Sequence, residues 1–307
     1  MNPDILIPIA ITVIGASTPI LLAALGALVV EKSGVLNLGV EGMMLIGAVT
    51  AFAVTYGTGN AWLGVFCAAL AAAAASMIFA VLTLSLSANQ VATGLALTIF
   101  GTGLSTLVGQ AYTGRPVEIF RSVFPPELAA DPVWRLVFGH SPLVYFSLLM
   151  VAAVWWFLTR SRAGLILRAV GENDLSAHSI GYSVIGVRYL AVAFGGAMAG
   201  IAGSCFPLML TPQWAERMTA GRGWIAIALV VFSAWRPTRL LAGAYLFGAV
   251  TIGQLHAQAL GWPIPSQLLS ALPYLATIVV LVLISRNRRL TMVNTPASLG
   301  RPFVPDR

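Results

Sequence analysis

Residues 42–114 read GMMLIGAVTAFAVTYGTGNAWLGVFCAALAAAAASMIFAVLTLSLSANQVATGLALTIFGTGLSTLVGQAYTG, without a single Asp, Glu, Lys or Arg. A helix needs about 20 apolar residues to cross the hydrocarbon layer of a bilayer. The run is therefore long enough for three crossings, separated by turns at 57–60 and 87–90. It predicts a chain that has lipid as its solvent over much of its length.

The same absence of charge marks most of the remaining chain. Asp, Glu, Lys and Arg are also missing from residues 5–30, 136–159, 189–215, 223–235 and 240–285. Charged residues make up only 9% of the chain, whereas a soluble domain has roughly a quarter. So few charges could not cover the surface of a soluble fold. The first run lacks the basic flank and cleavage site of a signal peptide, so we expect it to stay as a span.

These runs and the turns between them predict an all-α, polytopic inner-membrane helical bundle of about nine spans, with eight and ten as alternatives. We expect residues 1–307 to form a single transmembrane domain. The predicted spans are 5–30, 42–56, 61–86, 91–112, 142–159, 189–210, 223–235, 240–260 and 265–285.

The basic residues predict the orientation of the bundle. Arginines gather in the loop 160–188, the turn 236–239 and the tail 286–307, which fall on one side if nine spans are correct. The positive-inside rule makes that side cytoplasmic. We therefore expect a multi-pass protein with its N-terminus outside and its C-terminus in the cytoplasm. The net charge of +7 is explained by orientation in the membrane, without nucleic acid as a partner.

The sequence lacks the motifs of catalysis and of metal binding. It has no phosphate loop, no H-E-x-x-H, no G-x-S-x-G and no C-x-x-C. The three histidines lie far apart, and Cys67 and Cys205 sit in apolar runs as expected for core residues. We expect no catalytic residue, metal or cofactor. The span interiors also lack the carboxylates typical of proton- or sodium-coupled pumps, so energy for transport is expected from another chain.

The first motif that could carry function is GVLNLGVEGMMLIGA, residues 34–48. Asn37 and Glu41 are four residues apart at the mouth of a span and would share one helical face. Polar residues at such a depth indicate a solute pathway. Alternatively, Glu41 lies in the headgroup region and pairs with Lys32.

Two further motifs supply candidates for the pathway. In ANQVATGLALTIFGTGLS, residues 88–105, Asn89 and Gln90 mark a turn and, with Thr93, are candidates for the pathway. The hydroxyls of Thr93, Thr98, Thr102 and Ser105 could meet a polar solute or bond to carbonyls of their own helix. In TAGRGWIAIALVVFSAW, residues 219–235, Arg222 precedes a short span. A short or broken helix can aim its N-terminus at a solute, whereas an arginine at this position could equally extend to the membrane surface.

The fourth motif is RAVGENDLSAHSIGYS, residues 168–183, in the most polar internal loop. Asn173 or Asp174 is a good N-cap, and residues 175–180 would form less than two helical turns. Gly181 suits the position after the helix. The pattern is typical of a short surface helix on which a soluble partner docks. An ordinary connecting loop is the alternative.

In this order and spacing, the four motifs resemble those of permease subunits of bacterial ABC importers. The branch is the one that handles sugars, nucleosides and branched-chain amino acids. Over residues 18–284 the sequence looks most like permeases for nucleosides and simple sugars that work with a basic-membrane-protein-type lipoprotein. The resemblance implies an alternating-access permease, without enzymatic activity, in a dimer with a second permease chain.

The resemblance also implies the other partners. A cytoplasmic ABC ATPase would bind the loop 160–188, and an extracytoplasmic lipoprotein would deliver the solute. Residues 171–181 match the family's docking loop, so Glu172, Asn173 and Ala177 would face the ATPase between Gly171 and Gly181. A branched-chain amino acid permease is an alternative, and so is a secondary transporter that works alone. A membrane enzyme is a third possibility, but it would need a cluster of catalytic residues, which the sequence lacks.

Overall fold

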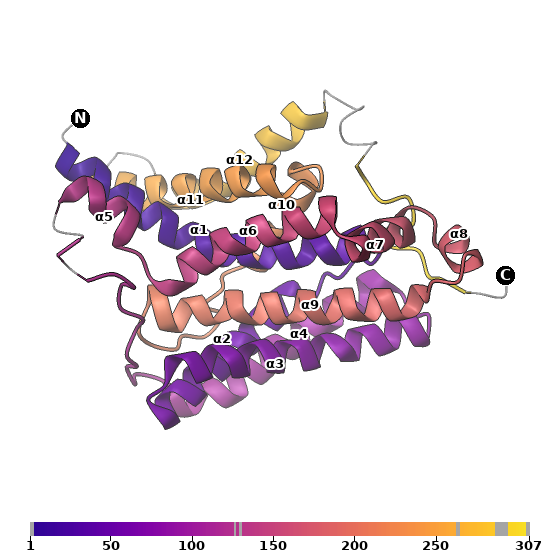
Figure 1. The fold of residues 1–307 in the computed structure, drawn as a ribbon. Coiled ribbons are helices and arrows are strands. Elements are labelled where there is room, and N and C mark those ends of the chain that lie inside the picture. Colours follow the sequence, from indigo (N-terminus) through magenta and orange to yellow (C-terminus); the bar gives the residue numbers. More distant parts are fainter. Residues whose placement is uncertain (1–2, 126, 129–130, 262–264, 286–293, 305–307) are drawn as a thin grey trace.

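The computed structural model describes residues 3–304 apart from 126, 129–130, 262–264 and 286–293. Within these ranges every regular element is a helix, and β-structure is limited to one isolated bridge between Pro116 and Gln213. The predicted all-α bundle is confirmed (Figure 1). Its α-helices are α1 (Pro3–Lys32), α2 (Val40–Thr58), α3 (Ala61–Ala80), α4 (Gln90–Gly109), α5 (Pro132–Phe138), α6 (Pro142–Arg160), α7 (Arg162–Glu172), α8 (Asp174–Ser179), α9 (Val184–Cys205), α10 (Arg222–Phe232), α11 (Pro237–Ala259) and α12 (Ser266–Ser285).

Short irregular helices extend three of these elements. A π-helix, η1 (Val81–Ser85), continues α3, and another, η3 (Phe206–Leu210), continues α9. A 3-10 turn, η2 (Gln110–Tyr112), continues α4. With these extensions α3, α4 and α9 become apolar helices of 25, 23 and 27 residues, long enough to cross a bilayer.

Seven helices in the described part of the chain are long and apolar enough to span a membrane. They are Leu6–Lys32, Val40–Thr58, Ala61–Ser85, Gln90–Tyr112, Pro142–Arg160, Val184–Leu210 and Pro237–Ala259. Helix α10 coincides with the seventh predicted span but has only 11 residues, and α12 coincides with the ninth. The protein is therefore a multi-pass membrane protein, and the count of nine stays a prediction.

Asparagine caps fix where two of the spans begin. The Asn60 side chain accepts hydrogen bonds from the backbone N–H groups of Trp62 and Leu63, at 3.0 and 3.2 Å. The Asn89 side chain accepts one from the N–H of Ala92 at 3.0 Å. Each bond satisfies a donor that the first helical turn leaves unpaired. The predicted turns before 61 and 91 are therefore explained by capping.

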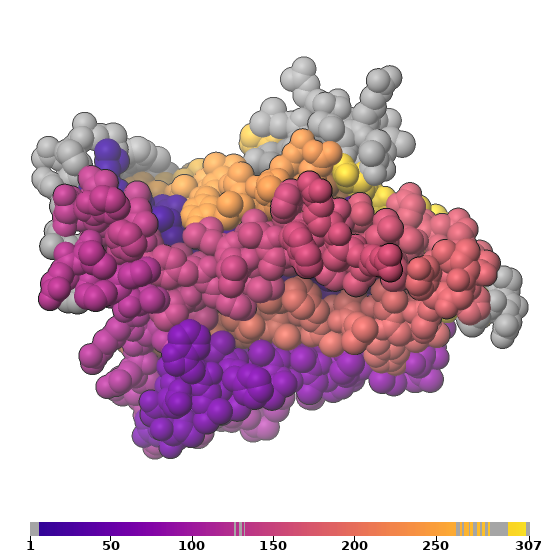
Figure 2. All heavy atoms as spheres, in the orientation of Figure 1, coloured from indigo at the N-terminus to yellow at the C-terminus, as the bar shows by residue number. Residues whose placement is uncertain are grey.

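The bundle is packed through small residues around α1, α2, α3 and α9. A Cβ atom on Gly47 of α2 would lie 2.5 Å from the Cα atom of Gly200 on α9, so the two backbones touch at this point. In lipid, where no hydrophobic effect drives helices together, such close approach supplies the packing energy. Helix α9 lies between α6 and α3 (Figure 1), and its side chains form a band between theirs (Figure 2).

The two ends of the bundle differ. Helix α5 lies near the N-terminus at one end (Figure 1). At the other, which we call the α8 end, α7 and α8 lie beside the last turn of α1 and residues 294–304 of the tail. The predicted loop 160–188 and the described part of the tail therefore share one end, as the arginine pattern requires.

Candidate functional site

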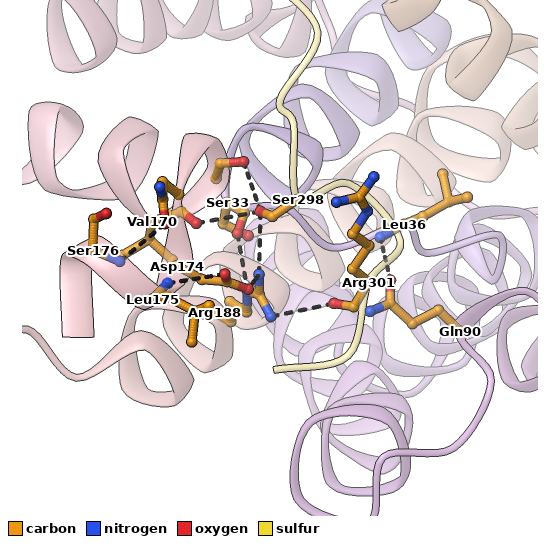
Figure 3. Close-up of polar contacts among 12 residues, drawn as sticks. Ser33, Leu36, Gln90, Val170, Asp174, Leu175, Ser176, Arg188, Ser298 and Arg301 are labelled. Atoms are coloured by element: carbon orange, nitrogen blue, oxygen red, sulfur yellow. Dashed lines mark hydrogen bonds and ion pairs between the residues drawn. The ribbon is translucent and has the colours of Figure 1, made fainter. Parts of the chain in front are cut away.

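The segment between α1 and α2, residues 33–39, runs alongside the first turns of α4. The Gln90 Oε1 atom accepts a hydrogen bond from the Leu36 N–H at 2.8 Å (Figure 3), and the Thr98 hydroxyl donates to the Leu38 carbonyl at 3.1 Å. These two α4 residues are eight positions apart, which is about 12 Å along a helix. The chain therefore travels well into the bundle before α2 begins at Val40.

Helix α10 is likewise a partial span that begins inside the bundle. Its 11 residues cover about 16 Å, roughly half of a ~30 Å hydrocarbon layer. Beyond its C-terminal end, the Trp235 indole donates a hydrogen bond to the Glu31 carboxylate in the last turn of α1, at 2.7 Å. The N-terminus of α10 therefore lies about half a membrane thickness from the α8 end.

Glu41 joins the beginnings of these two broken helices. Its carboxylate accepts three hydrogen bonds, from the Thr219 hydroxyl at 2.5 Å, the Gly221 N–H at 2.8 Å and the Gly223 N–H at 2.6 Å. The residue is only 7% exposed. A carboxylate is favoured here because the N-terminal turn of a helix carries unpaired N–H groups and a partial positive charge. Glu41 thus fixes the start of α10 against the start of α2.

A cavity of about 490 Å³ opens beside this junction. It lies between α2, α4, α10 and the segment before α10. Its lining consists of Glu41, Leu45, Thr98, Ile99, Thr102, Arg217, Ala220, Gly221 and Trp224. The backbone at Arg217, Ala220 and Gly221 is in the left-handed region, with φ of 52°, 48° and 79°, and strained backbone of this kind is concentrated at functional sites.

A second polar cluster lies at the α8 end, around a buried arginine in the first turns of α9. The Arg188 side chain is 1% exposed and forms an ion pair with Asp174 at 3.0 Å (Figure 3). It also donates to the Ser33 carbonyl at 3.1 Å, to the Ser298 hydroxyl at 3.3 Å and to the Arg301 carbonyl at 3.4 Å. One guanidinium therefore ties together the end of α1, α8, α9 and the tail.

The tail fastens this cluster further. The Ser298 hydroxyl and backbone N–H both donate to the Gly171 carbonyl, at 2.6 and 3.0 Å. The Gly300 N–H donates to the Gly34 carbonyl at 3.0 Å. The Phe303 ring packs edge-on against His178, with centroids 5.5 Å apart. We call residues 294–304 the tail strap, because they run across α7, α8 and the end of α1.

Helix α8 itself is capped at both ends. The Asn173 side chain accepts a hydrogen bond from the Ser176 N–H at 2.9 Å. Gly181 has φ of 93° and its N–H bonds to the His178 carbonyl, while the Tyr182 N–H bonds to the Ala177 carbonyl. This pair of bonds is a complete Schellman motif, which favours glycine at the left-handed position. The predicted short capped helix is confirmed.

Comparison with known proteins decides the family. A family model described as "Branched-chain amino acid transport system / permease component" matches residues 9–284. The chain belongs to this family of ABC transporter permeases.

The permease has close relatives of known name. It is 43% identical over 295 residues to a putative glucose ABC transporter permease of Haloferax volcanii, covering 87% of this chain and 88% of the relative. It is 31% identical over 307 residues to a guanosine ABC transporter permease of Bacillus subtilis, covering 94% and 93%. A nucleoside ABC transporter permease of Lactococcus lactis is 31% identical over 281 residues, covering 87% and 89%. A second ABC permease from each of the first two organisms also matches.

Of the six residues predicted for the pathway, only Glu41 lines the cavity of the permease. Its predicted alternative, a pair with Lys32, is wrong, because the Lys32 ammonium donates instead to the Asn294 carbonyl at 2.7 Å. Asn37 is buried, and its side chain accepts from the Gly39 N–H at 2.8 Å. Asn37 therefore shapes the segment before α2.

The other four predicted residues are also placed away from the cavity lining. Asn89 is exposed and caps α4, and Gln90 is buried where it bonds to the segment before α2. Thr93 lines a separate groove of about 390 Å³, together with Phe79 and Phe100. The Arg222 guanidinium lies over the Phe206 ring at 5.1 Å from its centroid.

The sequence analysis missed Arg217 and Trp224 in the lining. Arg217 lies two residues before the motif 219–235 and Trp224 lies within it, and the only available signal was that this motif contains a short span. At the α8 end, Glu172 and Asn173 are exposed as expected, but Gly171 and Ala177 are buried. Ala177 is 2% exposed and packs with Val170, Val184 and Phe303, so its side chain lies on the inner side of α8, and its contact with the ATPase stays a prediction.

Proposed function

We propose that this permease is the membrane-embedded subunit of an ATP-driven importer for nucleosides or simple sugars. Its relatives are named for glucose, guanosine and nucleosides, which supports this choice of solutes over branched-chain amino acids. The mechanism is alternating access, in which ATP binding by a separate protein changes the side of the membrane to which the solute path is open. The permease itself hydrolyses nothing.

The observation that carries the proposal is the construction of the α8 end. Helix α8 exposes apolar side chains, with Leu175 52% and Ile180 71% exposed. Single exposed leucines are ordinary, but these two flank a capped helix that the buried Arg188 joins to α1 and α9. A push on α8 would therefore be transmitted to two spans. We propose that this surface, together with Glu172 and Asn173, docks the ATPase.

The remaining partners and the orientation follow from the same proposal. The chain forms one transmembrane domain over residues 1–307, with the loop 160–188 and the tail 286–307 in the cytoplasm and the N-terminus outside. It resides in the cell membrane and pairs with a second permease chain, since two organisms each have two matching permeases. An extracytoplasmic binding lipoprotein delivers the solute.

The test of this function is reconstitution. The permease, its companion permease and the ATPase are placed in proteoliposomes with the loaded binding protein. We expect ATP-dependent uptake of labelled guanosine, ribose or glucose, and none when the ATPase is omitted. Gradient-driven uptake by the permease alone would identify a secondary transporter. Uptake of leucine in place of the other solutes would identify a branched-chain amino acid permease.

The docking surface has its own test, Leu175→Glu. A carboxylate at the centre of an apolar contact would be desolvated without a partner, so we expect the ATPase to be lost from the purified complex. Leu128→Glu is the matched control, because Leu128 is also an exposed leucine, 51% accessible, in the segment before α5. Equal retention of the ATPase in both variants would refute α8 as the docking element.

A further inference from the structure

We infer that the cavity beside Glu41 binds a neutral, hydroxylated ring of the solute, either a monosaccharide or the ribose of a nucleoside. Trp224 supplies a flat surface for stacking, and Thr98, Thr102 and Arg217 supply polar contacts. The inference rests on the proposed function and adds the place and the chemistry of recognition.

The depth of the cavity suits a transport site. The cavity borders the N-termini of α2 and α10. Because α10 is about 16 Å long, its N-terminus lies about half the thickness of the hydrocarbon layer from the α8 end. Solute sites in transporters are typically formed near the midplane by interrupted helices. The volume of about 490 Å³ lies within the range of roughly 300–1,000 Å³ usual for small-molecule sites.

The charges of the lining favour a neutral solute. The lining contains one carboxylate, Glu41, and one guanidinium, Arg217. Both Glu41 oxygens already accept hydrogen bonds from the segment around the start of α10. They also offset the partial positive charge of that helix end. The two charged groups of the lining are of opposite sign, so the cavity has no net charge that would call for an ionic solute.

The hydroxyl groups of the lining are arranged as acceptors. Thr98 donates its hydroxyl proton to the Leu38 carbonyl at 3.1 Å, and Thr102 donates its own to the Thr98 carbonyl at 2.8 Å. A hydroxyl that has given its proton away still has lone pairs to accept with. Both threonines thus offer acceptors for the hydroxyl protons of a solute, while Arg217 offers donors.

Trp224 gives the cavity its apolar surface. It stands in the first turn of α10 and is 37% exposed, which leaves part of the indole accessible to the cavity. Indole rings combine a large flat face with an N–H donor. Aromatic side chains of this kind bind the flat face of a ring by stacking, as they do with the bases of nucleic acids. A ring with a flat face and a hydroxylated edge matches this combination.

A second, larger cavity lacks the hydroxyl and charged groups that line the cavity at Glu41. It measures about 580 Å³ between α6, α7 and α9, and its lining is almost entirely apolar, including Met150, Trp156 and Phe194. This lining has no hydroxyl, carboxylate or guanidinium group, and its one polar side-chain group is the indole N–H of Trp156. Most hydroxyl groups of a solute would be buried there without a partner, which is unfavourable. The smaller cavity at Glu41 is therefore the better site for a polar solute.

Protection of an introduced thiol tests the inference. Thr102→Cys is made in a Cys67→Ser background within the full importer complex, and its modification by a water-soluble thiol reagent is timed. The remaining cysteine, Cys205, is fully buried. Ala96→Cys is the matched control, since Ala96 is on the same helix but lines the separate groove with Thr93. We expect solute to slow modification at 102 and leave modification at 96 unchanged.

Two comparisons sharpen the result. Trp224→Ala in the Thr102→Cys protein should raise the solute concentration for half protection about tenfold, because one stacking contact is lost. Trp224→Phe should restore most of the protection.

The choice of solute is the second comparison. If guanosine protects and ribose and glucose do not, the solute is a nucleoside, and the reverse result identifies the solute as a free sugar. Protection by leucine alone, or no protection while ATP-driven uptake persists, overturns the inference and leaves the proposed function standing. Absence of ATP-driven uptake refutes the proposed function itself.

Discussion

Two of the buried ionisable side chains, Glu41 and Arg188, have opposite roles. Glu41, inside the bundle, accepts all its bonds from one short segment around the start of α10. Arg188, at the α8 end, donates to partners from three segments that lie 14 to 155 residues away. The carboxylate therefore fixes one local junction, whereas the guanidinium joins distant segments. We conclude that the first shapes the cavity and that the second links α8 to α1 and α9, which pack against α10 and α2.

The largest effect should follow from Glu41→Gln. The amide group would bring its own N–H donors toward three donors that now share a carboxylate. Because the residue is only 7% exposed, water can replace few of the lost bonds. Each buried donor left unpaired costs about 1–3 kcal/mol. We expect loss of uptake and a lower thermal midpoint of the complex. Glu118→Gln, at an exposed glutamate between α4 and α5, should change neither, and a fully active Glu41→Gln complex would contradict the role of Glu41.

A smaller and different effect is expected from Arg188→Lys. Lysine keeps the positive charge but lacks the planar fork that reaches four acceptors at once. The ATPase should remain bound because Leu175 and Ile180 are unchanged, yet less solute should be moved for each ATP hydrolysed. Arg162→Lys, at an exposed position in α7, is the control. Equal loss of uptake and of ATPase binding would show that Arg188 supports folding alone.

The smallest effect should come from Ser298→Ala in the tail strap. This change removes the hydroxyl contacts with Gly171 and Arg188, but keeps the backbone bond to Gly171. Loss of such a bond costs about 1 kcal/mol. We expect faster chymotryptic cleavage after Phe303 and nearly normal uptake. Unchanged cleavage would mean that the hydroxyl does not hold the strap in place.

The positions of most spans could be predicted from the sequence, because a run of 20 residues without charge is long and apolar enough to cross a bilayer. It placed the second span at 42–56, and α2 is Val40–Thr58. The sixth span was predicted to begin after Arg188, because hydropathy treats a charge as the end of a span. Helix α9 begins at Val184 instead. The charge of Arg188 is stabilised by partners in other segments, which the sequence around Arg188 does not indicate.

The candidate site was only partly predictable for the same reason. Glu41 stands out because a carboxylate at the start of an apolar run is unusual. Arg217 and Trp224 belong to a loop and a half-helix, and they reach α2 and α4 only through the fold. The burial of Ala177 could not be predicted from the local sequence, because a capped helix on the surface has a buried side as well as an exposed one, and the tail strap that covers the buried side lies more than 100 residues later.

The link between α8 and the cavity is tested most directly by timing the modification of Thr102→Cys in the intact importer, with and without a trapped ATP-bound state. The account predicts that trapping ATP changes the rate at position 102, and that Leu175→Glu abolishes this change without altering the rate in the absence of ATP. A rate at position 102 that is identical in both states, in a complex that still imports solute, would contradict it.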